Sequence, residues 1–184
     1  MNKKKLLLVL AAVLLLCIAV CGTLAWLTSE TDPVVNTFTV GNIDLDLTET
    51  TGSEYKMVPG TDVTKDPKLT VEADSEACYL FVKIDKENGF DSYATFTVAD
   101  GWTQGDGTDI PTNVYYRLVD ATTADTDFAI IKDNKVSVKE DVTKAMMDAI
   151  AEGSEPKLIF TGYAIQQANI ADAETAWAKL NPST

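Results

Sequence analysis

Apolar and polar residues alternate along most of this chain, but an uninterrupted apolar run over residues 6–20 comes first. Further on, Ile43, Leu45 and Leu47 alternate with acidic residues, which is the period of a β-strand with one face towards water. Similar patterns predict a series of strands along the rest of the chain. The expected strands cover residues 34–40, 43–47, 68–72, 79–84, 96–98, 114–119, 128–132, 135–138 and 158–165.

Turn residues separate these segments. The apolar phase slips by one position at Gly41-Asn42, which predicts a bulge or turn, because such a slip reverses the buried face. The pair Asp133-Asn134 tolerates the positive φ of a tight turn. We therefore expect strands 128–132 and 135–138 to form a hairpin.

Two segments have a helical period. Apolar residues recur three and four positions apart over 142–150, after Asp141 as the expected cap, and this helix is expected to cover part of the sheet. A shorter helix is expected over 173–180, capped near Asp172. Many strands and few helices favour a mainly β protein, a two-layer antiparallel β-sandwich with one or two short helices.

The N-terminus has the organisation of a signal peptide. Lys3, Lys4 and Lys5 precede the apolar run, and Thr23-Leu24-Ala25 places small residues where a signal peptidase requires them. We expect cleavage between Ala25 and Trp26, which divides the chain into a helical signal peptide (1–25) and one extracellular domain (26–184). Two alternatives remain open: a retained membrane anchor, and a lipoprotein modified at Cys21.

The charge of the chain argues against nucleic-acid binding. The whole chain has a net charge of −13, and removal of the first 25 residues leaves 12 basic against 28 acidic residues, a net charge of −16. A polyanion would be repelled, and the basic residues are scattered along the sequence. We expect a solvated acidic surface and contact with the membrane only through the signal segment before cleavage.

The residues offer little for catalysis, because the chain contains no histidine. Imidazole-dependent triads and zinc sites are therefore excluded, and we predict no enzyme, cofactor or metal site. The segment Asp106 to Asp109 offers oxygens near a glycine turn, but it lacks the ligand spacing of a calcium loop, so a polar loop is expected. Cys78 lies beside an apolar run and is expected to be a buried thiol.

Three aromatic residues are candidates for carbohydrate binding. Trp102, Tyr115 and Tyr116 offer flat faces to a sugar, although Tyr115 and Tyr116 are adjacent in a predicted strand and so face opposite ways. Packing at the edge of the core is the simpler interpretation.

Several motifs resemble those of the TasA/camelysin family of exported Gram-positive proteins, which are processed by the signal peptidase SipW. At the front these are the lysine cluster, the apolar run, and the segments 22–28 and 36–45. Looser similarities lie at 58–60, 65–67, 79–83, 163–166 and the segment containing Ala176-Trp177. One departure is Cys21-Gly22, where the family often has two glycines.

The resemblance implies a jelly-roll-like β-sandwich that is secreted to the cell surface or biofilm matrix and assembles into fibres. It also carries a metallopeptidase classification, which the missing histidines contradict. The primary expectation is a structural matrix or fibre subunit that associates with itself and with other matrix or cell-surface proteins. A surface-displayed adhesion or glycan-binding module is the alternative, and a metal-dependent peptidase is a distant third.

Cleavage would expose an extended, partly apolar end at residues 26–40. Its apolar residues would bury little as an isolated tail, whereas the open edge of a neighbouring sandwich would pair its backbone and cover its side chains. The alternative is that this segment folds back as the first strand of its own domain. The candidate donor residues are Val34, Val35, Phe38 and Val40.

Overall fold

The computed structural model describes residues 3–4, 41–52 and 55–180, and the chain divides into two compact units, residues 1–39 and 40–184. The predicted signal peptide cleavage at Ala25-Trp26 and the candidate donor segment 34–40 lie outside the described residues. None of the helices in the described ranges is long and apolar enough to cross a membrane.

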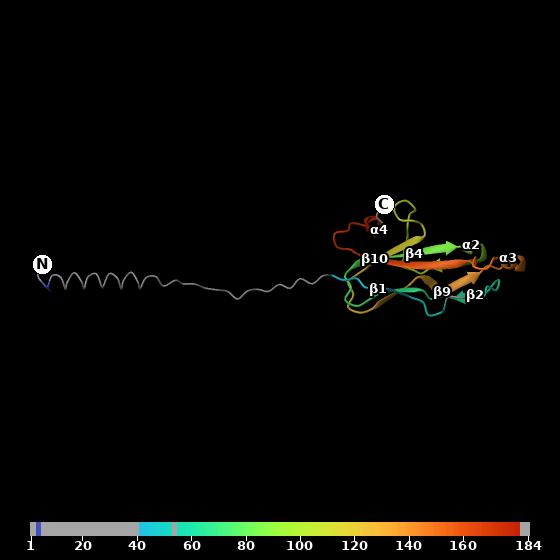
Figure 1. Cartoon of the computed structure of the whole chain (residues 1–184), viewed down its shortest axis with the longest axis horizontal. Coiled ribbons are helices and arrows are strands. Elements are labelled where there is room, and N and C mark those ends of the chain that lie inside the picture. The colour runs from blue at the N-terminus through green and yellow to red at the C-terminus, as the bar shows by residue number, and fades with distance from the viewer. Residues whose placement is uncertain (1–2, 5–40, 53–54, 181–184) are drawn as a thin grey trace. The chain divides into compact units, whose positions relative to one another are not determined.

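The second unit is mainly β, with three antiparallel sheets and a few short helices, an arrangement that fits a β-sandwich (Figure 1). One sheet has four strands, with β4 and β7 in the middle. In order across the sheet these are β10 (Lys157–Gln166), β4 (Cys78–Glu87), β7 (Val114–Val119) and β6 (Thr103–Gln104).

Two three-stranded sheets lie on the other side of the core. The first comprises β1 (Leu45–Thr48), β3 (Lys68–Val71) and β8 (Thr126–Ala129). The second comprises β2 (Asp62–Thr64), β9 (Ile131–Val138) and β5 (Ala94–Val98). The predicted strand 114–119 is therefore confirmed with the same bounds, and the predicted strands 43–47, 68–72, 79–84, 96–98 and 158–165 are confirmed with shifted ends.

Strand β4 is buried on both faces. Leu80, Val82 and Ile84 point into the space between the layers and belong to the largest buried cluster. Tyr79 and Phe81 point to the opposite face, where they pack in a second cluster with helix α4 (Ala173–Leu180). A strand that alternates strictly between core and solvent would expose one face to water. In β4 this second face is covered by α4 instead.

The last helix follows the sequence prediction closely. The Asp172 carboxylate accepts a hydrogen bond from the Thr175 backbone N–H at 2.8 Å, which is the bond of a helix N-cap. Trp177 packs on Phe81 and Tyr163, with ring centroids 5.3 and 5.4 Å apart. The predicted helix therefore exists, and its apolar face covers the four-stranded sheet.

The helix predicted over 142–150 is much shorter. Helix α3 spans Lys144–Asp148, its cap is Thr143 rather than Asp141, and none of its residues is buried. It lies near one end of the sandwich and does not cover the sheet (Figure 1). The spacing of apolar residues predicted too early a start for this helix, because Val142 is buried as part of the preceding turn and not as part of the helix. A four-residue helix, α2 (Phe90–Tyr93), was not predicted.

The predicted hairpin over 128–138 is wrong. Strand β8 pairs with β3, whereas β9 pairs with β2 and β5, so the two strands belong to different sheets. They are joined through buried Ile130, whose N–H donates to the Pro67 carbonyl and whose carbonyl accepts from the Ala99 N–H. The segment is thus one nearly continuous strand that changes partners.

Asp133 and Asn134 do adopt positive φ, 56° and 53°, but they do so inside β9. Between the pairs Phe96–Val136 and Val98–Ile131, β9 advances by five residues and β5 by two. The additional residues form a bulge, which uses the same left-handed backbone conformation as a tight turn.

Candidate functional site

The described residues contain no group of three or more His, Cys, Asp or Glu side chains that could hold a metal ion. Cys78 is fully buried, and its burial raises the pKa of the thiol to about 11, so the thiol is protonated at neutral pH. This agrees with the prediction of a buried structural cysteine.

The loop that begins at Asp106 is held by hydrogen bonds from its backbone N–H groups to the Asp106 side chain. Asp106 Oδ1 accepts hydrogen bonds from the N–H groups of Thr108, Asp109 and Ile110 at 2.8, 3.2 and 3.4 Å. The bond from Thr108 contributes most to holding the pKa of this carboxyl below its usual value. The carboxylate therefore stabilises a polar loop, as expected from the sequence.

The three aromatic residues considered for carbohydrate binding do not form one platform. Tyr115 packs against the interlayer cluster and Tyr116 against the cluster under α4, so they face opposite ways as predicted. The Trp102 indole N–H donates to the Ala129 carbonyl at 2.9 Å, and the Arg117 guanidinium lies 5.5 Å from its ring centroid. These contacts place Trp102 within the edge of the sandwich.

The described part of the chain has an open side between β7 and β8. Strand β8 is the last strand of its sheet, and β7 pairs with β6 only through Tyr115 and Tyr116. The backbone of β8 on the side away from β3, and that of β7 beyond Tyr116, therefore has no strand partner among the described residues. Such edges accept a further strand.

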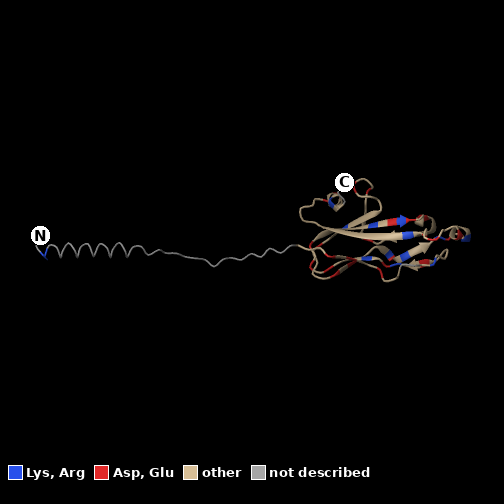
Figure 2. Ribbon diagram, in the orientation of Figure 1, with Lys and Arg blue, Asp and Glu red and all other residues tan. Residues whose placement is uncertain are grey.

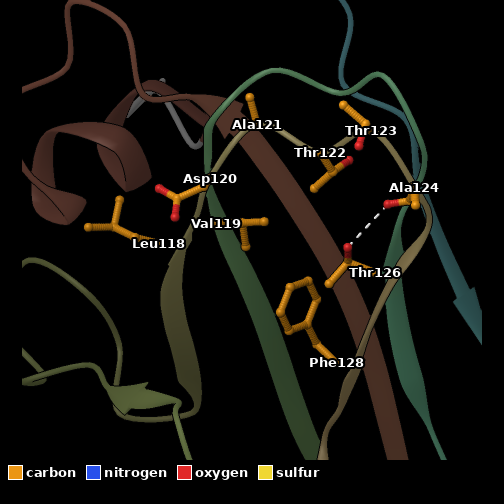
Figure 3. Close-up of a pocket in the computed structure, with 9 residues that line it drawn as sticks. All are labelled: Leu118, Val119, Asp120, Ala121, Thr122, Thr123, Ala124, Thr126 and Phe128. Carbon is orange, nitrogen blue, oxygen red and sulfur yellow. Dashed lines mark hydrogen bonds between the residues drawn. The ribbon is translucent and has the colours of Figure 1, made fainter.

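A hollow of about 390 Å³ lies at this open side, and we call it the β7–β8 slot. It is lined by residues 118–124 together with Thr126 and Phe128. Figure 3 shows Val119 and Phe128 turned into the space between the two strands, with the loop after Asp120 arching over one end. The slot therefore combines an apolar floor with unpaired strand edges.

The loop over the slot is held to the neighbouring sheet. Thr122 donates its backbone N–H to the Ser75 carbonyl and its hydroxyl to the Glu72 carbonyl, both at 3.0 Å. The Asp125 carboxylate accepts from the Ala73 N–H at 2.9 Å. This end of the slot is therefore preformed in the single chain.

A larger cavity of about 610 Å³ lies among β2, β9 and the start of β10. Lys65 lines it and pairs with Glu49 at 2.6 Å, while its ammonium lies 5.1 Å from the centroid of the Tyr55 ring. Tyr55 donates its hydroxyl to Glu49 as well. Lys65, Glu49 and Tyr55 are thus bonded to one another, whereas the strand edges of the β7–β8 slot have no strand partner among the described residues.

Sequence reasoning missed the residues of the slot. Leu118 and Val119 were expected only as part of a strand, and Phe128 was assigned to a hairpin. Arg117 was not singled out, although its being the only arginine of the chain was a usable signal. Figure 2 shows basic residues interspersed with acidic ones over the sandwich, in keeping with the scattered pattern in the sequence.

The predicted functional residues Ala25, Trp26, Val34, Val35, Phe38 and Val40 all lie outside the described residues. Comparisons with protein-family models, with curated proteins and with solved structures find no match to this chain.

Proposed function

We propose that this chain is a non-enzymatic structural subunit of an extracellular fibre or biofilm matrix of a Gram-positive bacterium. In this proposal residues 1–25 direct export, and cleavage between Ala25 and Trp26 releases the subunit to the matrix or cell surface. The signal-peptide pattern and the resemblance to the TasA/camelysin family support the route. A mainly β domain that fits a sandwich is compatible with the jelly roll that the resemblance implies.

Assembly proceeds by donation of the N-terminal segment to a neighbouring subunit. The observation that carries this proposal is the unpaired edge of β8 beside the β7–β8 slot. An incoming strand at this edge gains backbone hydrogen bonds, and its alternate side chains enter the slot. Because donor and acceptor are different surfaces, the contact is heterologous, and it propagates as a filament where its rotation does not close a ring. Other matrix or surface proteins join through the same edge at a fibre end.

Deletion of residues 26–35 tests the proposal. Residues 1–25 lie outside the compact unit 40–184, so a chain beginning at Trp26 keeps every described core residue. We expect the chain 26–184 to form filaments in electron micrographs, and the chain 36–184 to remain folded by circular dichroism but monomeric. Fibres of equal yield from the truncated chain would place the assembly contact elsewhere on the sandwich.

A matched pair of variants separates strand donation from a general effect of the tail. Phe38 and Val40 share one face of an extended strand, and Thr37 lies on the other. Phe38→Lys should stop polymerisation, because it places a charge on the apolar face that the donated strand turns towards the acceptor. Thr37→Lys makes the same charge change on the opposite face and should polymerise.

A further inference from the structure

Arg117 lies at the β7–β8 slot between two aromatic rings. Its guanidinium carbon is 4.3 Å from the centroid of Phe128, a residue that lines the slot, and 5.5 Å from that of Trp102. The backbone of Gly101 is also close, since a Cβ there would lie 3.3 Å from both terminal nitrogens of the guanidinium. The planar head is therefore held in one orientation by stacking.

This cation has no anionic partner among the described residues. Seven lysines in the same part of the chain pair with carboxylates at 2.6 to 3.2 Å, yet the single arginine pairs with none. Its Nε is buried without a hydrogen-bond acceptor. Desolvation lowers the pKa of the guanidinium, as expected for a cation whose charge is uncompensated. In a chain with 28 acidic residues, an arginine that pairs with no carboxylate in the described ranges is conspicuous.

The chemistry of this arrangement selects a carboxylate. A guanidinium presents two parallel N–H groups that match the two oxygens of a carboxylate, and stacking on aromatic rings removes much of the entropy cost of orienting it. The pair would form at a partly desolvated edge, where it is stronger than on an open surface.

We propose that Arg117 is the carboxylate-binding residue of the acceptor slot and that it takes Asp32 of a second copy of this chain. If the donated segment is extended, Asp32 shares a face with Val34 and Phe38, because the three are separated by even numbers of residues. Two residues of strand span about 7 Å. Val34 can therefore occupy the slot beside Phe128 while Asp32 reaches the adjacent guanidinium. This inference rests on the proposed fibre function.

Charge exchange tests the pairing in the chain 26–184, with filament growth followed by light scattering and electron microscopy. Arg117→Glu should slow growth by on the order of tenfold or more, the loss that follows removal of one partner of a desolvated pair. Asp32→Lys alone should have a similar effect. The double variant Arg117→Glu/Asp32→Lys should recover growth, because the pair is restored with reversed charges.

Two variants keep the experiment interpretable. Lys144→Glu makes the same charge change on exposed α3 and should polymerise like the wild type. Arg117→Lys retains the charge but not the planar guanidinium, so filaments of this variant should grow at an intermediate rate. This variant tests the pairing even if circular dichroism shows that Arg117→Glu is misfolded.

Each outcome has one meaning. Recovery in the double variant supports the pairing. The pairing is overturned if Arg117→Glu grows like the wild type, or if the double variant folds but does not recover growth. In either case, fibre formation by the unmodified chain leaves the proposed function intact. Absence of fibres from the unmodified chain overturns both.

Discussion

At the scale of single residues, Gly162 of β10 sets how closely the two layers approach. A Cβ at this position would lie 2.4 Å from Leu69 Cδ2 and 3.3 Å from Leu45 Cδ2. Leu69 is fully buried, so its side chain has little room to give way. We expect Gly162→Ala to lower the free energy of unfolding by about 1–3 kcal/mol through overpacking.

A double-mutant cycle in urea identifies the cause. Leu69→Val shortens the side chain that the new methyl group would meet, so the cost of Gly162→Ala should be smaller by at least about 0.5 kcal/mol in that background. An unchanged cost would mean that the effect of the alanine does not arise from Leu69.

At the scale of elements, the bulge in β9 depends on residues that accept positive φ. Asp133 is exposed and lies at φ 56°, a conformation that a β-branched residue disfavours strongly. Asp133→Val should therefore cost roughly 1–3 kcal/mol of unfolding free energy. Asp133→Gly is the matched control, since glycine adopts this conformation without strain, and it should stay within about 0.5 kcal/mol of the wild type. Equal stability of the two variants in urea would contradict this role for the bulge.

At the scale of the whole molecule, hydrogen-bonded carboxylates make the fold sensitive to acid. Asp66 shows the reason: its carboxylate accepts from Thr50 and from both the hydroxyl and the backbone N–H of Thr51, and the Thr50 hydroxyl contributes most to lowering its pKa. The carboxyls with pKa values held below their ordinary range by such bonds include Asp62, Asp66, Asp106, Asp127 and Asp172.

These shifts determine the direction of the pH dependence. A carboxyl whose pKa is lower in the folded than in the unfolded chain stabilises the fold at pH values above its pKa in the unfolded chain, near 3.8. This contribution is lost as the pH falls through the pKa that the carboxyl has in the folded chain. The unfolding temperature should therefore fall between pH 5 and pH 2 when it is measured by circular dichroism. Asp66→Asn should be less stable than the wild type at pH 7 and should lose less over this range; an equal loss would exclude a contribution from Asp66.

Local pattern alone determined much of this protein. Alternating apolar residues identified most of the strands, because a half-buried strand has a period of two wherever it lies in a sheet. The cap at Asp172 and the apolar spacing up to Leu180 identified α4, since both signals lie within the helix itself. The burial of Cys78 followed from its apolar neighbours, and the missing histidines removed whole classes of chemistry without reference to any fold.

Tertiary structure decided what local pattern left ambiguous. Asp133-Asn134 tolerates positive φ in a hairpin turn and in a bulge alike, and only the long-range partners of β8 and β9 select the bulge. The burial of Tyr79 and Phe81 required α4, which comes from the far end of the chain. The slot forms where β8 ends its sheet and β7 extends past β6, and Arg117 lies beside Phe128 there with no carboxylate partner among the described residues. A sheet edge depends on the order of strands in space, which no single segment encodes.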